Sequence, residues 1–262
     1  MSTPFQIVTW NVNSIRARLD HLVNWLNNHG PDVICLQETK VVDELFPLEE
    51  IQEVGYEVHF AGQKSYNGVA ILSKHKIEEP WIGFDGDNGD DQKRIIGVTV
   101  QGIQIVNVYV PQGSEVTSDK FQYKLDFLKK LDELIREKFT PDQPLAVVGD
   151  INIAPGDGDV VDPVAMAGEV SFHPLEHEAL GKIMDFGFSD LFRVFSSEPG
   201  QFSWWDYRHG SFRRNKGMRI DLLMVSDALK HCATGCWMDK EERTREKPSD
   251  HAPVVGEFSW PG

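Results

Sequence analysis

Nine short runs of apolar and β-branched residues, each four to eight residues long, constrain the fold of this chain more than any other feature. Several of them are nearly continuous, which is typical of strands in sheets that are covered on at least one face. Helical patterns and Gly or Pro residues separate the runs, as in α/β proteins. The predicted strands are Gln6–Val12, Asp32–Gln37, Tyr56–Phe60, Gly68–Leu72, Arg94–Val100, Ile103–Val110, Leu145–Val148, Arg219–Val225 and Val254–Phe258.

Helical periodicity predicts three helices between these strands. In Ile15–Asn28 the apolar residues recur on one face, and a Gly-Pro pair ends the segment. Phe121–Phe139 has the same pattern, and Leu175–Phe186 is the third predicted helix. The predicted loops, rich in glycine and acidic residues, are Asp85–Asp91 and Gly156–Asp162. Because no linker and no repeat of about 20 to 50 residues is present, we expect residues 1–262 to form one α/β domain with two facing sheets.

The three cysteines, Cys35, Cys232 and Cys236, are too few and odd in number for a disulfide framework, which favours a reducing compartment. We interpret them as buried thiols, because a zinc site needs further ligands and only His231 lies beside the second and third cysteines. The N-terminal segment lacks the basic and apolar regions of a signal peptide, and no apolar run reaches the ~18 residues that span a bilayer. We therefore expect a soluble, cytoplasmic protein without a membrane partner.

The charge balance argues against a nucleic-acid partner, since 41 acidic and 26 basic residues give a net charge of −15. Binding to phosphates, however, needs only a local basic face. The stretch RHGSFRRNKGMR offers one, with no acidic residue among its basic ones, Arg208, Arg213, Arg214, Lys216 and Arg219. Taken alone, this stretch fits a DNA-binding loop and a solvated surface loop equally well.

Polar residues interrupt or end five of the apolar segments, where a rigid scaffold can hold functional side chains. A single such junction carries little weight, because Asp and Asn often end strands simply by forming turns. Asp221 is different, because a carboxylate inside an apolar strand is costly unless His251, Arg219 or a metal pairs with it. The set supplies oxygen ligands, a histidine beside a carboxylate and amide donors, which suit a magnesium ion and attack by water on a phosphate. Its members are Asn11, Asn13, Gln37, Glu38, Asp150, Asn152, Asp221, Asp250 and His251.

Seven motifs follow one another from Trp10 to Val254: WNVNSIRAR, PDVICLQETK, NVYVPQG, GDINIAP, FSWWDYR, MRIDLLMVS and KPSDHAPV. Together they resemble the exonuclease III branch of the endonuclease/exonuclease/phosphatase superfamily over nearly the whole chain. The resemblance implies a four-layered α/β sandwich, with two mixed β-sheets packed face to face and helices outside. It also implies a Mg²⁺-dependent DNA-repair phosphodiesterase, with Mn²⁺ as a possible substitute. Such an enzyme cuts abasic (AP) sites and has 3′–5′ exonuclease and 3′-phosphatase activity in base excision repair.

The resemblance also assigns roles to matching positions. Glu38 corresponds to the principal magnesium ligand, Asp150 to the residue that orients or deprotonates the attacking water, and Asn152 to a donor to a phosphate oxygen. His251, oriented by Asp221, corresponds to the histidine that binds the scissile phosphate or transfers a proton. The implied catalytic residues are Tyr109, Asp150, Asn152, Asp221 and His251. The implied metal-binding residues are Asn11, Glu38, Asp150, Asn152, Asp250 and His251.

Contacts with double-stranded DNA are implied for a further group of residues. Trp204 should lie beside a flipped-out abasic sugar, and we expect Phe202 and Met224 to complete an apolar wall around it. Each position in the group could instead be a solvated face or part of the core. We expect a monomer that needs no small-molecule cofactor. The implied DNA-binding residues are Arg94, Gln112, Lys120, Lys124 and Trp204, together with Arg213, Arg214 and Lys216 of the basic stretch.

Three other functions remain open from the sequence. The segment GEVSFHPLEHEALGK departs from the usual family pattern at His173, Leu175 and Ala179, which would suit an enzyme that mainly trims 3′ ends and cuts AP sites weakly. A superfamily phosphodiesterase acting on RNA or another phosphate ester shares the same core residues. A non-catalytic nucleic-acid-binding regulator is the third, although the residues for catalysis are all present.

Overall fold

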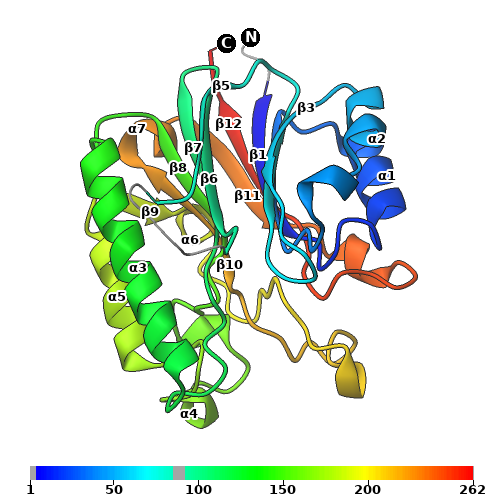
Figure 1. The fold of residues 1–262 in the computed structure, drawn as a ribbon. Helices are drawn as coiled ribbons and strands as arrows, with labels where there is room; N and C mark the ends of the chain where they lie inside the picture. The colour runs from blue at the N-terminus through cyan, green and yellow to red at the C-terminus, as the bar shows by residue number, and fades with distance from the viewer. Residues whose placement is uncertain (1–3, 85–91, 262) are drawn as a thin grey trace.

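The computed structural model describes residues 4–84 and 92–261, which form two six-stranded β-sheets packed face to face (Figure 1). The first sheet contains, in spatial order, β11 (Ala233–Met238), β12 (Val254–Ser259), β1 (Pro4–Asn11), β2 (Val33–Gln37), β4 (Val69–Ser73) and β3 (Glu57–Ala61). The second contains β5 (Glu78–Ile82), β6 (Ile95–Val100), β7 (Ile103–Tyr109), β8 (Leu145–Asp150), β10 (Asp221–Ser226) and β9 (Phe188–Asp190). Both sheets are mixed, because β1 runs parallel to β2 and β7 runs parallel to β8, whereas the other neighbours are antiparallel.

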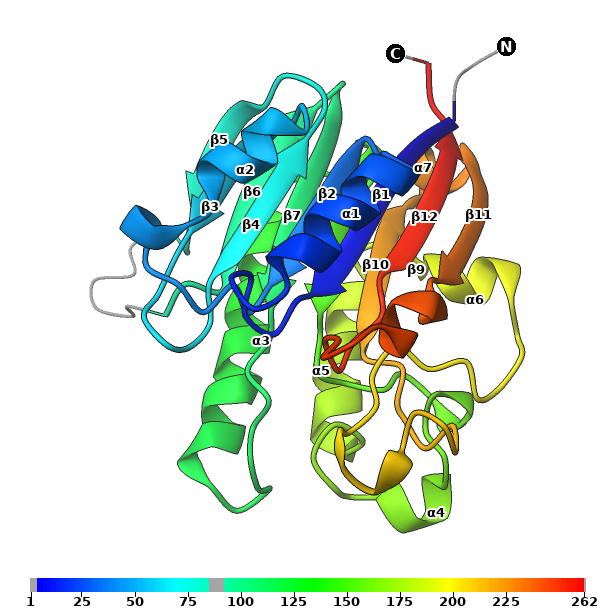
Figure 2. The same cartoon turned by 90° about the vertical axis from the view of Figure 1, so that its right-hand side faces the viewer.

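Helices cover the outer face of each sheet, so the molecule has the four layers that the family resemblance implies (Figure 1), and Figure 2 views it from the side of the helices that cover the first sheet. The first sheet is covered by α1 (Leu19–His29) and α2 (Leu48–Glu53), and the second by α3 (Asp119–Lys138) and α5 (Pro174–Met184). Three shorter helices lie in the connections: α4 (Pro163–Met166), α6 (Leu191–Phe195) and α7 (Asp227–Lys230). None of the helices in the described ranges is long and apolar enough to cross a membrane.

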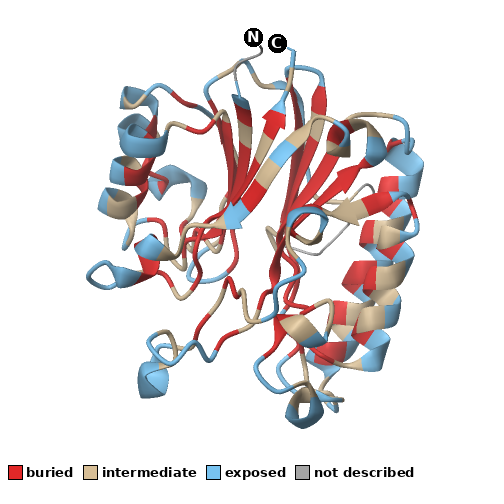
Figure 3. Ribbon diagram, turned by 180° about the vertical axis from the view of Figure 1, so that it is seen from behind, coloured by how far each residue is buried: buried red, intermediate tan, exposed pale blue. Residues whose placement is uncertain are grey.

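The apolar core occupies three layers, which explains why the strand sequences are nearly continuous in hydrophobicity. Ile7 and Cys35 pack between the two sheets, whereas their neighbours Val8 and Ile34 pack beneath α1. Both faces of the central strands are therefore buried, as the burial colouring of Figure 3 shows. A strand with two buried faces gains nothing from alternating polar residues.

The nine predicted strands and three predicted helices are all present, with shifted ends. The first helix begins at Leu19 instead of Ile15. Ile15 lies in the preceding turn, where its backbone N–H donates to the Thr39 carbonyl. The Gly156–Asp162 loop contains a 3₁₀ turn at Asp157–Asp159, and the other predicted loop, Asp85–Asp91, lies outside the described residues. The strands β5, β9 and β11 were not predicted.

Both termini lie at one end of the sandwich (Figure 1), and β1 runs away from them. The strand β2 is parallel to β1, so its last residue reaches the same, opposite end. The β7–β8 pair ends there too, because Asp150, the last residue of β8, accepts a hydrogen bond from Asn11, the last residue of β1. Four strand ends from two sheets therefore meet at one edge of the molecule.

Candidate active site at the ends of two parallel strand pairs

Strand register brings the predicted polar residues together. Asn11 at the end of β1 lies opposite Gln37 at the end of β2, next to Glu38. In the second sheet, Asp150 at the end of β8 lies opposite Tyr109 on one side and Asp221 on the other. The junctions identified in the sequence therefore form one continuous site across both sheets.

The backbone at these ends adopts conformations that position side chains at the edge of the sandwich. Glu38 and Asn152 have positive φ angles of 53° and 55°, which non-glycine residues rarely adopt and which often mark functional sites. Gly149, just before Asp150, must be glycine because a Cβ there would lie 1.8 Å from the Val108 carbonyl oxygen. This close approach allows β8 to pair with β7 up to the last residue of each strand.

Asn11 connects the two sheets through its amide nitrogen. Its Nδ2 donates to Glu38 Oε1 at 2.8 Å and to Asp150 Oδ2 at 2.9 Å. Its Oδ1 accepts the backbone N–H of Asn13 at 3.0 Å. In this arrangement the amide nitrogen of Asn11 faces both carboxylates as a donor, and the assignment of Asn11 as a metal ligand through its oxygen stays a prediction.

Glu38 is held as a carboxylate. Its Oε2 lies 2.7 Å from Lys40 Nζ, a residue that the sequence reasoning had not included in the site. Burial raises the pKa of Glu38, but Lys40 and the Asn11 amide outweigh burial, so the pKa lies below its ordinary value. Burial and the negative charges of Glu38 and Asp150 raise the pKa of Tyr109 well above its ordinary value. Tyr109 therefore remains a protonated phenol that can donate a hydrogen bond.

The buried carboxylate of Asp221 is paired with His251, one of the three partners expected from the sequence. His251 Nδ1 lies 2.8 Å from Asp221 Oδ2, and the same oxygen accepts from Ser203 Oγ at 2.6 Å. His251 Nε2 lies 3.8 Å from Asp150 Oδ2. With Nδ1 fixed on Asp221, the Nε2 atom is the one that faces Asp150.

The pKa values of Asp150 and His251 are both raised above their ordinary values. Burial raises the pKa of Asp150 to about 7, with a further contribution from Asp221 and an opposing one from His251. Burial lowers the pKa of His251, but the carboxylates of Asp221 and Asp150 outweigh burial and raise it to about 10. A protonated His251 donates from both ring nitrogens, to Asp221 and toward the substrate side.

Glu38, Asp150 and His251 form the group of potential metal ligands within residues 4–84 and 92–261, with ligand atoms all within 4.8 Å of one another. The two carboxylates supply the hard oxygen atoms that Mg²⁺ prefers. His251 Nδ1 is occupied by Asp221, so Nε2 is the ring nitrogen left to face a metal or a phosphate, and the assignment of His251 as a metal ligand stays a prediction. The residues present thus fit a divalent cation held between Glu38 and Asp150.

Asp250 lies outside this group of ligands. Its Oδ1 accepts from Asn13 Nδ2 at 2.9 Å, and its Oδ2 accepts from the Trp204 indole at 3.1 Å. Its pKa is lowered, because His251 and these donors outweigh the effect of burial. Asp250 thus links the metal side of the site to the indole of Trp204.

Trp204 forms part of an apolar wall next to Asp250. It is half-buried and packs against a cluster that contains Phe172, Met218 and Ile220. The two residues expected to complete this wall lie elsewhere. Phe202 packs with Trp205 and Ala252, and Met224 is buried between the second sheet and its helices, because successive strand residues face opposite sides of a sheet.

The structure contradicts one of the expected DNA contacts. Lys124 is completely buried and forms an ion pair with Glu176, so its ammonium is not available to a phosphate. Arg219 of the basic stretch is also buried, where it pairs with Asp159 and Asp190. A basic residue in an amphipathic or strand segment can lie on the buried face when an acid compensates it.

The remaining expected DNA contacts stay predictions. Arg94 is half-buried, with its guanidinium 4.7 Å from the centre of the Tyr109 ring. The other side chains in this group are exposed: Gln112, Lys120, Arg213, Arg214 and Lys216. Exposure is required for phosphate contact but is also typical of any solvated basic loop.

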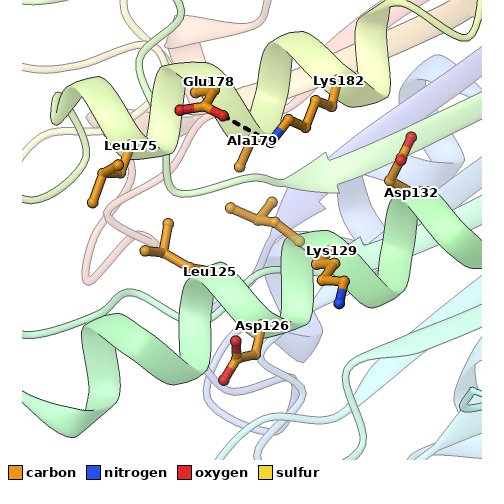
Figure 4. Close-up of a pocket in the computed structure, with 9 residues that line it drawn as sticks. Leu125, Asp126, Lys129, Asp132, Leu175, Glu178, Ala179 and Lys182 are labelled. Carbon is orange, nitrogen blue, oxygen red and sulfur yellow. Dashed lines mark hydrogen bonds and ion pairs between the residues drawn. The ribbon is translucent and has the colours of Figure 1, made fainter.

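A hollow of about 260 Å³ lies between α3 and α5 (Figure 4). Leu175 and Ala179 line it, and none of the metal-group residues does. These two departures from the family pattern are therefore on the outer helices and do not alter the site. The third, His173, is the N-cap of α5 and packs edge-on against the ring of Phe121.

The chain matches the model of the Endonuclease/Exonuclease/phosphatase family over residues 8–251. It is 36% identical to Exodeoxyribonuclease III from Haemophilus influenzae, an alignment that covers 97% of this chain and 99% of that protein. A solved 3′ phosphatase from Neisseria, bound to a product DNA hairpin, is 36% identical, with a TM-score of 0.95 over 98% of this chain and 100% of the other. A solved AP endonuclease from Archaeoglobus fulgidus is 37% identical, with a TM-score of 0.94 over 97% and 99%.

Proposed function

The chain belongs to the exonuclease III branch of the endonuclease/exonuclease/phosphatase family and is a DNA-repair hydrolase of that type, and from this premise we propose that it cleaves phosphate esters of duplex DNA with bound Mg²⁺. The proposed substrates are AP sites, 3′-terminal nucleotides and 3′-terminal phosphates. The observation that carries the proposal is the meeting of Glu38, Asp150 and His251 within 4.8 Å. The carboxylate oxygens of Glu38 and Asp150, which can bind a metal, therefore lie beside the imidazole of His251, which can donate a proton.

The roles of the residues follow from their contacts. A magnesium ion at Glu38 and Asp150 would supply positive charge to the phosphate oxygens. Asp150 accepts a hydrogen bond from the attacking water and takes its proton. His251, held by Asp221, donates from Nε2 to the phosphate, which concentrates donors where negative charge develops in the transition state.

Two further donors complete the phosphate site. Tyr109 is a protonated phenol beside Glu38 and donates to a phosphate oxygen. Asn152 keeps one amide hydrogen for the substrate, since the other is donated to the Val110 carbonyl at 3.0 Å. Fixed donors of this kind lower the barrier because they need no reorganisation during the reaction.

The apolar wall supports recognition of an extruded abasic sugar. Trp204 and Met218, which are both half-buried, offer a surface without hydrogen-bonding groups for a base, because the one indole N–H of Trp204 is donated to Asp250. Extruding a nucleotide costs least where no base is stacked or paired. A wall that fills the space of a base would favour the abasic nucleotide further.

An enzyme that mainly processes 3′ ends is the second candidate. It is favoured by the similarity to the Neisseria 3′ phosphatase and by His173 at the head of α5. The residues just before His173 lie beside the catalytic loop, because Ala154 N donates to the Ser171 carbonyl at 2.9 Å. The departure from the family pattern at His173 therefore lies next to a contact with the loop that carries Asn152.

One assay separates the two candidates. Cleavage rates are measured on a duplex with an internal AP site and on a nicked duplex with a 3′-phosphate, each titrated with Mg²⁺ and with Mn²⁺. Comparable rates would support the primary proposal, whereas a rate on the 3′-phosphate alone would support the second. Activity on both substrates without any divalent ion would refute the proposed metal dependence.

Trp204→Ala tests the apolar wall in the same assay. If the wall selects abasic nucleotides, AP-site cleavage should fall much more than 3′-phosphate removal. If Trp204 only packs the core, both rates should fall equally, together with a large decrease in melting temperature, since loss of a buried aromatic costs roughly 3–5 kcal/mol.

The basic loop tests the proposed DNA face. We expect DNA affinity to fall steeply with salt, and replacing Arg213, Arg214 and Lys216 with Ser to flatten the plot of log affinity against log salt. An unchanged slope would identify the loop as a solvated surface. The monomeric state and the cytoplasmic location stay predictions from the sequence.

A further inference from the structure

We propose that Lys124 is a positioning residue, whose buried ammonium, neutralised by its ion pair with Glu176, fixes Asn152 and the loop that carries Gln112. The inference rests on the proposed function, because it assigns to Lys124 an effect on catalysis through Asn152. Neither residue is within the group that would hold the metal. The pair lies behind the site, between the outer helices α3 and α5.

The ammonium of Lys124 is surrounded by three oxygen atoms. Its Nζ donates to the Asn152 carbonyl at 2.7 Å and to the Gln112 carbonyl at 3.3 Å, and it forms an ion pair with Glu176 Oε1. Lys124 and Glu176 are both fully buried. An ammonium has three N–H donors, so each hydrogen has one acceptor.

Glu176 anchors the pair to the start of α5. Its second carboxylate oxygen accepts the backbone N–H of His173 at 3.0 Å, which is the capping box of that helix. Lys124 projects from the facing side of α3. The pair therefore connects two helices that pack against each other with two loops that carry the expected substrate contacts.

The two loops follow adjacent parallel strands, and Lys124 is the donor that they share. Asn152 is further held by its own N–H, which donates to Asp150 Oδ1 at 3.0 Å, and by its Nδ2, which donates to the Val110 carbonyl. Its left-handed backbone needs such support, because that conformation is intrinsically disfavoured. Lys124 supplies the donor to the remaining backbone group of Asn152.

The charge of the pair is the observation that packing alone does not explain. A buried ion pair is costly to desolvate, and apolar residues of the same size are often as stabilising or more so. The neighbouring contacts between α3 and α5 include Leu128, Leu131, Leu180 and Ile183, all apolar. An ammonium at this single position is accounted for by two loop carbonyls that only a donor can satisfy.

Three variants separate the donor from the ion pair. Lys124→Met removes the donor to both carbonyls, and Glu176→Gln breaks the ion pair but leaves that donor in place. The double variant Lys124→Met/Glu176→Gln removes the donor without leaving an unpaired charge. We expect Lys124→Met and the double variant to lower kcat on both DNA substrates by roughly tenfold to a hundredfold, with a small change in KM. Glu176→Gln should retain most of kcat.

A double-mutant cycle gives the readout that a purely structural role would not produce. If Lys124 acts through Asn152, the loss in kcat should disappear when Lys124→Met is combined with Asn152→Ala. The controls are Lys129→Met, an exposed lysine of α3, and Leu180→Ala, a core change in α5 that lowers the melting temperature but removes no hydrogen bond to either loop. Both controls should retain kcat at a temperature where they are folded.

The outcomes distinguish the inference from its premise. Normal turnover of Asn152→Ala would refute the proposed role of Asn152 and with it the proposed chemistry. A low turnover of Asn152→Ala together with a normal turnover of Lys124→Met/Glu176→Gln would refute only the positioning role of Lys124. So would equal losses in Lys124→Met and Glu176→Gln, or the same fold-loss from Lys124→Met in the Asn152→Ala background.

Discussion

Each of the two parallel strand pairs ends in a carboxylate that accepts a hydrogen bond from the same amide, and the pKa values of these two carboxylates are shifted in opposite directions. Glu38 follows β2 in the first sheet, and Asp150 ends β8 in the second; Asn11 Nδ2 donates to both. The pKa of Glu38 is lowered, whereas that of Asp150 is raised to about 7. The two ends are alike in topology and differ in their surroundings.

Exposure and neighbouring charge explain the difference. The side chain of Glu38 is 17% exposed and is paired with Lys40, whereas that of Asp150 is 2% exposed and lies beside Asp221. Two titratable groups whose environments move their pKa values apart are suited to different tasks. In the proposed mechanism, Glu38 is the permanent anion for the metal, and Asp150 is the group that can exchange a proton near neutral pH.

The largest effect is expected from Asp150→Asn. Asparagine has nearly the same shape but cannot take a proton from water, so turnover should fall on the order of a hundredfold or more. Raising the Mg²⁺ concentration should not restore it. The measurement is kcat on a 3′-phosphate duplex over a Mg²⁺ series, with a melting curve to show that the variant is folded.

Glu38→Gln should give a large loss of a different kind. An amide is a much weaker ligand than a carboxylate for a hard divalent ion, so activity should be abolished at limiting Mg²⁺ and partly recovered at high Mg²⁺. If Asp150→Asn were rescued by Mg²⁺ and Glu38→Gln were not, the assigned roles of the two strand ends would have to be exchanged.

The fold was predictable from the sequence wherever both faces of a strand are buried. The strands β2, β4 and β6 consist entirely of buried residues, so their hydrophobicity identifies them without any knowledge of the fold. The three missed strands, β5, β9 and β11, are all at sheet edges and contain exposed or half-exposed residues. Edge strands have one neighbour and are held by pairing more than by burial, which leaves little trace in the sequence.

The site was predictable to the extent that its residues stand at strand ends. Lys40 and Ser203 were missed, because they act through neighbours that only the folded chain brings together. The error at Lys124 was avoidable, however. Lys124 lies three residues after Phe121 and four before Leu128, so helical periodicity already placed it on the buried face of α3.

A smaller effect is expected from Lys40→Met, which removes the cation beside Glu38. With no ammonium competing at Glu38, Mg²⁺ should bind more tightly, and half-saturating Mg²⁺ should fall by about twofold to fivefold, the scale of one partly exposed charge pair. The matched control is Lys76→Met, an exposed lysine that is remote from the site. Weaker Mg²⁺ binding in Lys40→Met would show that Lys40 orients Glu38 and does not compete with the metal.

The smallest effect concerns the stability of the metal-free protein. Asp150 and His251 have raised pKa values in the folded chain, about 7 and about 10. In an unfolded chain these groups titrate near ~3.9 and ~6.5. A raised folded-state pKa contributes stability that is complete below the unfolded pKa and is lost as pH rises through the folded pKa. Glu38 and Asp250 have lowered pKa values and remain ionised near neutral pH.

The melting temperature of the metal-free protein should therefore fall as pH is raised from about 6 to about 8.5, because the folded chain holds a proton on Asp150 up to about pH 7 and on His251 throughout this range, whereas the unfolded chain releases both. Excess Mg²⁺ should reduce this slope, because a cation between the carboxylates replaces the protons that the folded site otherwise binds. Asp150→Asn should also reduce it, since asparagine does not titrate, whereas Glu38→Gln should leave the Asp150 contribution in place. Equal slopes in Asp150→Asn and in the parent protein would mean that the carboxylate at the end of β8 is ionised throughout this pH range, as the one that follows β2 is. The two carboxylates would then not differ in protonation near neutral pH, and the proposed division of roles between Asp150 and Glu38 would be wrong.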